Sequence, residues 1–164
     1  MRWPGWTEHR TLLLPLPEPP PTSPLHLAGL VLAPKRELHV TLIGRALGAR
    51  LHASLREPYL GAAVRAAFDV LDWQIGFTGE LRLLRKPARR DDGTFGAVHS
   101  VIELVRLPAM VGFHRALGRL LGSELAVPPP HVTRYTEGRA EGIGVPRPSA
   151  LRAFSVRRLD AAPD

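Results

Sequence analysis

One short phrase occurs twice in this sequence, and its residue types are those of acid–base chemistry. The first copy is His39-Val40-Thr41-Leu42 and the second is His131-Val132-Thr133-Arg134. Each copy begins with a histidine, the side chain whose ordinary pKa lies nearest neutrality, and has a threonine hydroxyl two residues later. In a strand, residues i and i+2 project from the same face. Each copy would therefore present an imidazole beside a hydroxyl, with valine on the other face.

Two such pairs facing each other would form a metal-free acid–base site. One neutral imidazole can take a proton from water, while a second, protonated imidazole gives a proton to the leaving oxygen. The two threonine hydroxyls could each donate a hydrogen bond to a non-bridging oxygen of a phosphodiester. Hydroxyls, imidazolium and nearby arginine would stabilise the charge on the reacting group. We therefore predict four catalytic residues: His39, Thr41, His131 and Thr133.

Both copies fall in segments that we predict to be strands. Residues 38–43 are a short apolar run, and the second copy follows three consecutive prolines and continues into Tyr135. Strand alternation would place Tyr135 on the face of His131 and Thr133. We therefore predict that Tyr135 contacts substrate.

The other segments must position these strands. Helices are favoured at 45–56, at 61–72 and from Pro108 to Gly122, and strands at 74–84, 96–105 and 151–159. A polar turn is predicted at 86–93, and the proline-dense segment 15–24 is interpreted as a stiff connector. Helix and strand sets accompany both motifs, which indicates an internal duplication with an approximate two-fold axis.

Composition narrows the class of protein. The chain has 164 residues, and we predict one domain over residues 1–164. It has no apolar run of about eighteen residues, no secretory-type N-terminus and no cysteine. We therefore expect a cytoplasmic protein with no membrane partner, and we also expect a monomer. The net charge is +7, and all but two of the 22 basic residues are arginine. This excess indicates either an arginine-rich surface for phosphate or RNA, or the codon bias of a GC-rich genome.

The paired His-x-Thr-x motifs resemble those of the 2H phosphoesterase superfamily, including its bacterial 2′-5′ RNA ligase and cyclic phosphodiesterase branch. The resemblance extends by element order over residues 38–159, but its specific part is residues 39–42 and 131–134. It implies an α+β, bilobal fold in which two antiparallel-rich β-sheet lobes with flanking helices surround a central cleft. It also implies that His39 and His131 are the acid–base pair and that the two motif threonines bind phosphate. No metal or cofactor is then expected, and the partner would be RNA or a nucleotide with a cyclic or 2′-5′ phosphodiester.

One position departs from this resemblance. The fourth motif residue is usually apolar in the family, as Leu42 is here, but the second copy has Arg134. Alternation predicts that Arg134 points away from the cleft, on the side of Val132. Either it reaches solvent from a strand near the sheet edge, or a local twist turns it toward substrate. We therefore group Arg134 with Tyr135 as candidate substrate-binding residues.

The sequence favours a metal-independent phosphodiesterase that hydrolyses 2′,3′-cyclic phosphates or related RNA and nucleotide phosphoesters. Two alternatives use the same scaffold: a non-catalytic RNA-binding module, which the arginine excess suits, and an enzyme of the 2′-5′ RNA ligase type. In a third, the motifs are accidental and the protein is structural. A zinc site at His39 and His131 is disfavoured because no third ligand with a recognisable spacing accompanies them.

Overall fold

The computed structural model describes residues 1–159. Within them the chain forms eight strands and four helices, which confirms the predicted α+β class. In chain order these are β1 (Leu12–Pro15), β2 (Leu25–Leu27), β3 (Leu30–Pro34), β4 (His39–Ile43), α1 (Arg45–Ser54), α2 (Tyr59–Asp69), β5 (Gly76–Arg89), β6 (Phe95–Arg106), α3 (Ala109–Leu121), β7 (His131–Glu137), α4 (Pro148–Phe154) and β8 (Ser155–Leu159). No helix among these is long and apolar enough to cross a membrane.

The strands pair antiparallel in the order β1-β4-β7-β6-β5-β8. Two strands share the outer edge of β7, because β4 pairs with its first half and β3 with its second half. In the β3–β7 pair Ala33 lies opposite Thr136, and β2 forms a hairpin with β3. The connection between β3 and β4, residues 35–38, therefore lies beside the middle of β7.

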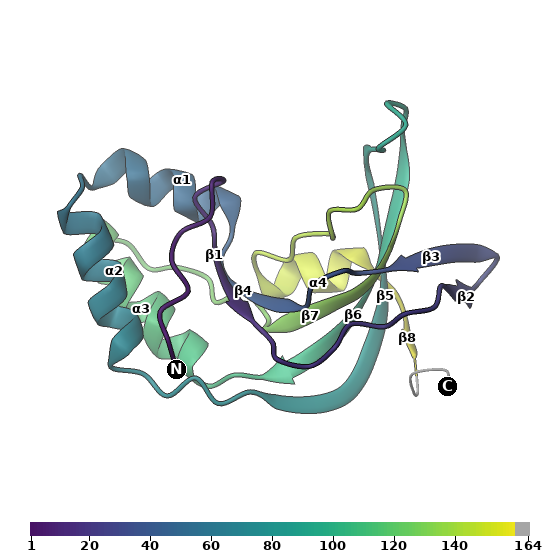
Figure 1. Cartoon of the computed structure of the whole chain (residues 1–164). Coiled ribbons are helices and arrows are strands. Elements are labelled where there is room, and N and C mark those ends of the chain that lie inside the picture. The colour runs from purple at the N-terminus through teal and green to yellow at the C-terminus, as the bar shows by residue number, and fades with distance from the viewer. Residues whose placement is uncertain (160–164) are drawn as a thin grey trace.

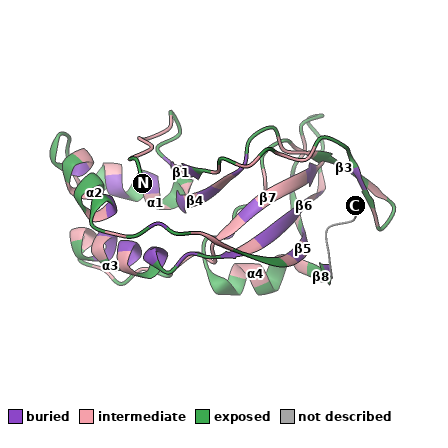
Figure 2. Ribbon diagram, turned by 60° about the horizontal axis from the view of Figure 1, so that its bottom comes forward, coloured by how far each residue is buried: buried purple, intermediate pink, exposed green. Residues whose placement is uncertain are grey.

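The helices divide between the two faces of the sheet. In Figure 1, α1, α2 and α3 lie together on one side of the molecule, and the long β5–β6 hairpin projects beyond the other strands. The largest buried cluster joins both motif valines, Val40 and Val132, to Phe68 of α2 and Phe113 of α3. Figure 2 shows buried residues along β6 and β7 and on α2 and α3. Burial of the valines fixes which face of each motif strand is turned away from the core.

A second hydrophobic cluster lies on the opposite face of the sheet. Ile102 of β6 is buried there together with Ile143 and Val145, which belong to the segment between β7 and α4. Leu151 and Phe154 of α4 pack against the same cluster. Thus the chain that follows the second motif folds back across the face that the motif valines do not occupy.

Most of the predicted elements are present, and two boundaries were wrong. The helix that follows Pro108 ends at Gly122 in the left-handed conformation (φ 64°), as expected for a glycine at this position. The strand predicted over 151–159 is wrong in its first half, because Pro148 starts a helix at its first turn and apolar residues of α4, which are partly buried, pack against the cluster. The turn predicted at 86–93 is shorter, since β5 continues to Arg89.

Candidate active site

The two motif strands are neighbours in the sheet. β4 and β7 run antiparallel, with Val40 opposite Val132. Extending this register by one residue in each direction sets each motif histidine opposite the threonine of the other copy. The polar residues of both motifs share the face opposite the buried valines: His39, Thr41, His131 and Thr133. The structure therefore brings together all four residues that were predicted to be catalytic.

The spacing within this quartet suits a tetrahedral group. Residues directly opposite in an antiparallel pair have Cβ atoms about 4.5–5.5 Å apart, and diagonal neighbours about 7–8 Å apart. His39 and His131 are diagonal neighbours, so their rings can reach opposite sides of one bound group. Each threonine lies directly across from an imidazole. The arrangement has a local two-fold axis at the valine pair, and it could hold two oxygens of a phosphate between two proton-transfer groups.

His131 is held in one tautomer by the chain that precedes it. Its Nδ1 lies 2.8 Å from the carbonyl oxygen of Pro129. A carbonyl only accepts, so Nδ1 carries the proton of the neutral ring and Nε2 is left with a lone pair. The carbonyl of Pro130 in turn accepts from the N–H of Val105 at 3.0 Å, which fixes the proline segment to the end of β6. Burial lowers the pKa of His131, and the hydrogen bond to Pro129 opposes that shift.

His39 lies in a different environment. It is half-buried, and burial is the main cause that lowers its pKa. The charge of Lys35 lowers that pKa further, as does His131 when it is protonated, while Glu37 raises it. Burial thus favours the neutral form of both rings. Each would be protonated more readily once an anionic substrate is bound beside it.

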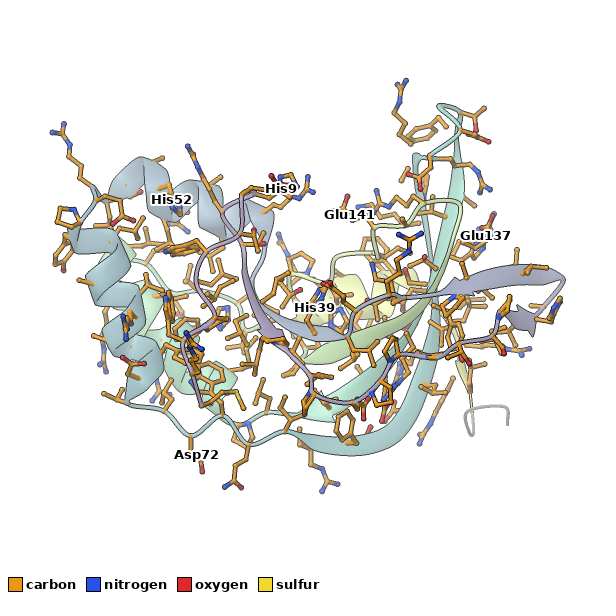
Figure 3. The ribbon with its side chains drawn as sticks, in the orientation of Figure 1. His9, His39, His52, Asp72, Glu137 and Glu141 are labelled. Atoms are coloured by element: carbon orange, nitrogen blue, oxygen red, sulfur yellow. The ribbon has the colours of Figure 1, made fainter. Side chains whose placement is uncertain are left out.

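A groove of about 860 Å³ begins at His39. It is lined by the β3–β4 connection, the turn of the β5–β6 hairpin and the segment that follows β7. Its charged lining residues are Lys35, Arg36, Glu37, Arg90, Asp91, Asp92 and Arg139. Figure 3 shows His39 near the centre of the molecule, with Glu141 on the segment that follows β7. The groove offers room for a substrate larger than the phosphate that the quartet would hold.

Residues 138–144, which we call the strap, follow β7, and the first three of them, Gly138, Arg139 and Ala140, line the groove. The Nζ of Lys35 donates to the carbonyl of Ala140 at 2.8 Å. The N–H of Ala140 donates to Oδ2 of Asp91 in the hairpin turn at 2.7 Å. The strap is therefore tied both to the chain just before the first motif and to the hairpin.

The strap also lies against a motif residue. A Cβ atom at Gly142 would be 2.9 Å from Oγ1 and 3.1 Å from Cγ2 of Thr133. The next residue, Ile143, donates its N–H to Oγ of the buried Ser100 at 3.0 Å, which fixes the strap at this level. Glycine is thus the residue that fits at position 142 without a shift of Thr133 or of the strap.

Tyr135 does not lie on the face of the quartet. β7 contains a bulge at Arg134, because Ile102 pairs with Thr133 whereas Val101 pairs with Tyr135. The extra residue reverses the alternation of the strand. Tyr135 consequently packs with Val101 in a buried cluster on the other face. The prediction that Tyr135 shares the face of His131 and Thr133 is wrong for this reason.

Arg134 points away from the quartet, on the side of Val132, as alternation predicted. It neither extends into solvent nor turns toward the quartet. Its Nε donates to Oε2 of the buried Glu103 at 2.7 Å, and its Nη2 donates to Oε1 of Glu18 at 2.8 Å. The guanidinium also lies 5.9 Å from the ring centre of Phe77. These partners come from β6, from the proline-dense segment and from β5, so the second motif alone could not reveal them.

Sequence reasoning missed Lys35 and Gly142 as residues of the site. Lys35 offered one indication, since it is one of only two lysines and lies four positions before His39. Within residues 1–159, no group of three or more His, Cys, Asp or Glu side chains is placed to hold a metal ion. Comparison of the chain with models of protein families, with curated proteins and with solved structures finds no match.

Proposed function

We propose that this protein is a metal-independent phosphodiesterase that hydrolyses 2′,3′-cyclic phosphates or related RNA and nucleotide phosphoesters, on a scaffold of the 2H phosphoesterase type. The pairing of Val40 with Val132 carries the proposal. The two copies of the motif could have fallen on distant strands, in a shifted register or on opposite faces. Instead they are neighbours in a register that gathers four polar side chains on one face. An accidental repeat gives no reason for that combination.

In the proposed reaction, water attacks the phosphorus atom of a cyclic phosphate. One motif histidine takes a proton from the water, a P–O bond of the ring breaks, and the other histidine gives its proton to the departing ribose oxygen. Thr41 and Thr133 donate hydrogen bonds to the non-bridging oxygens, whose negative charge grows in the transition state. The lone pair at Nε2 of His131 suits proton acceptance when that ring is neutral.

The test is hydrolysis of a 2′,3′-cyclic nucleotide in EDTA by the wild-type protein and by three histidine variants. We expect His39→Ala and His131→Ala each to lower kcat by about 10²–10⁴-fold, the usual contribution of general acid–base catalysis. His26→Ala is the matched control, because His26 is exposed on β2 and distant in the sheet from the quartet. Full activity in both motif variants would refute the proposal.

The groove supports a second candidate, a non-catalytic RNA-binding module. Four of its lining residues are cationic and three are acidic, and the chain as a whole is basic. Binding of single-stranded RNA would then survive both motif variants and weaken steeply as salt rises, because release of counterions from phosphate drives such binding. Binding of this kind by a protein that yields no nucleotide product would favour this candidate over the phosphodiesterase.

A further inference from the structure

Lys35 is a cation held at a fixed place beside the quartet. It is half-buried in the β3–β4 connection and lines the groove that begins at His39. Its backbone N–H donates to the carbonyl of Arg134 at 2.8 Å, and its Nζ donates to the carbonyl of Ala140 at 2.8 Å. Both ends of the residue are therefore held by main-chain atoms. Its influence on the pKa of His39 also reflects how near the ammonium lies to that imidazole.

Within the described part of the chain Lys35 forms no ion pair, although Glu37 and Glu141 lie near enough to act on its charge. Another cation of the groove, Arg90, is by contrast paired with Glu137 at 2.6 Å. An ammonium has three N–H donors, and the carbonyl of Ala140 uses one of them.

The bond from the ammonium to Ala140 is exposed, so the remaining N–H donors of Lys35 are accessible from the groove. Burial of the rest of the side chain lowers the pKa of Lys35, while Glu141 and Glu37 raise it from a distance. An anion bound in the groove would give this ammonium a direct counter-charge. A phosphate oxygen could accept from the two remaining N–H donors while the bond to Ala140 is kept. The planar fork of an arginine is less suited to such a compact arrangement.

We propose that the Lys35 ammonium contacts the reacting phosphate and stabilises the negative charge of its transition state. This inference rests on the proposed phosphodiesterase function and adds a fifth residue to the quartet. Lys35 is then a catalytic cation, while the strap it holds forms a wall of the same site.

The effect of the Lys35 charge on the pKa of His39 separates a catalytic role of Lys35 from a purely structural one. The charged and titratable groups that act on His39 are Lys35, His131 and Glu37. A positive neighbour disfavours the imidazolium form, so removing the Lys35 charge raises the pKa of His39. The limb of the pH–rate profile that His39 controls then moves to higher pH. Loosening of the strap would also expose His39 and raise its pKa, so the charge-preserving variant Lys35→Arg separates the two roles, because it should keep this limb near its wild-type pH.

The first experiment measures kcat/KM for a 2′,3′-cyclic nucleotide from pH 5 to 9 in the wild type, Lys35→Gln, Lys35→Arg and Arg50→Gln. Glutamine keeps an N–H donor without the charge, and arginine restores the charge. Arg50→Gln is the control for loss of one positive charge, because Arg50 is exposed on α1 and does not line the groove. We expect Lys35→Gln to lower kcat/KM about 100-fold, in the range for loss of one transition-state donor, and to shift the profile upward in pH. Lys35→Arg should recover part of the rate, and Arg50→Gln should stay within about threefold of wild type, as expected for an exposed charge. Wild-type rates and an unshifted profile in Lys35→Gln would overturn the inference.

A second experiment keeps the inference testable if the wild type does not turn over and the phosphodiesterase proposal fails. Binding of inorganic phosphate is then measured by calorimetry with the same variants, after thermal melts confirm that each is folded. Weaker binding in Lys35→Gln, by about tenfold, with unchanged binding in Arg50→Gln would support an anion site at Lys35. Equal binding in both variants, or no binding by the wild type, would overturn it.

Discussion

A single methyl group at position 142 should impair the chemistry while leaving the fold in place. Gly142→Ala would put a Cβ atom 2.9 Å from Oγ1 and 3.1 Å from Cγ2 of Thr133. Non-bonded carbon atoms prefer separations of about 3.5–4.0 Å, so Thr133 must rotate or the strap must lift by roughly half an ångström or more. Either response moves the hydroxyl out of line with a phosphate oxygen.

The expected loss of activity in Gly142→Ala follows from the hydrogen bond between Thr133 and a phosphate oxygen that is lost. A hydrogen bond to a charged group contributes about 1.5–3 kcal/mol. At about 1.4 kcal/mol per factor of ten, kcat/KM for a 2′,3′-cyclic nucleotide should fall by about 10- to 100-fold. The free energy of unfolding should fall by about 1–2 kcal/mol, the usual cost of a tight contact that the surroundings can relax. Urea denaturation measures the second quantity on the same preparation.

Two further variants decide whether the effect passes through the hydroxyl of Thr133. Gly144→Ala is the matched control, because a Cβ there meets nothing within 4 Å. It should leave kcat/KM unchanged and alter the unfolding free energy by less than about 1 kcal/mol. Thr133→Val removes the hydroxyl, and adding Gly142→Ala to it should cost little more activity. Gly142→Ala with the activity of Gly144→Ala, or full additivity with Thr133→Val, would refute the argument.

Three other predictions follow from burial and charge. Because burial lowers the pKa of both motif histidines, both limbs of the profile of kcat/KM against pH should lie below pH 6.5. The alkaline limb of the kcat profile should lie at higher pH, since substrate is then bound. Limbs of both profiles that coincide above pH 6.5 would contradict this. Burial also lowers the pKa of His114, so the unfolded state binds more protons just below pH 6.5 and stability falls as pH drops through that window. The free energy of unfolding, measured by urea denaturation, should therefore differ less between pH 5 and pH 7.5 in His114→Leu than in the wild type. An equal difference in the two proteins would be evidence against this role of His114. Arg134→Met should destabilise the fold by about 3 kcal/mol, because it leaves the Glu103 carboxylate unpaired. Adding Glu103→Gln should restore much of that stability, and neither the single nor the double variant should change kcat/KM. If the stability losses of the two substitutions simply add, the ion pair is excluded as the cause.

The quartet could be predicted from sequence because its two determinants are local. Each motif has a β-branched residue between two polar ones, and alternation alone assigns the faces. Helix boundaries at Pro108 and Gly122 were equally local, since proline at a helix start and left-handed glycine at its end have direct conformational causes. Register was the part that sequence could not supply: the pairing of Val40 with Val132 is set by how both strands join the core.

The errors fall where a distant partner decides the local geometry. The bulge at Arg134 accompanies ion pairs to Glu103 and Glu18, which are 31 and 116 positions away in the chain. Strand alternation beyond the bulge therefore gave the wrong face for Tyr135. The segment from Leu151 onward is apolar enough for a strand, but Pro148 begins a helix whose partly buried apolar residues pack against β5 and β6. In both cases tertiary packing outweighed the local pattern.

Arg134, which replaces the usual apolar residue at the fourth motif position, explains how a repeated motif can place its two histidines in different surroundings. Leu42 is buried in the core, whereas Arg134 forms the bulge at the point where β7 changes its partner from β4 to β3. The carbonyl of Arg134 accepts the N–H of Lys35 there, which sets the Lys35 ammonium beside His39. His131 has instead the carbonyl of Pro129 at its Nδ1. Burial lowers the pKa of both rings, but the Lys35 cation adds to this effect at His39, whereas the carbonyl of Pro129 opposes it at His131. Acid–base catalysis by two residues of the same type requires such a difference, because one must begin neutral and the other protonated.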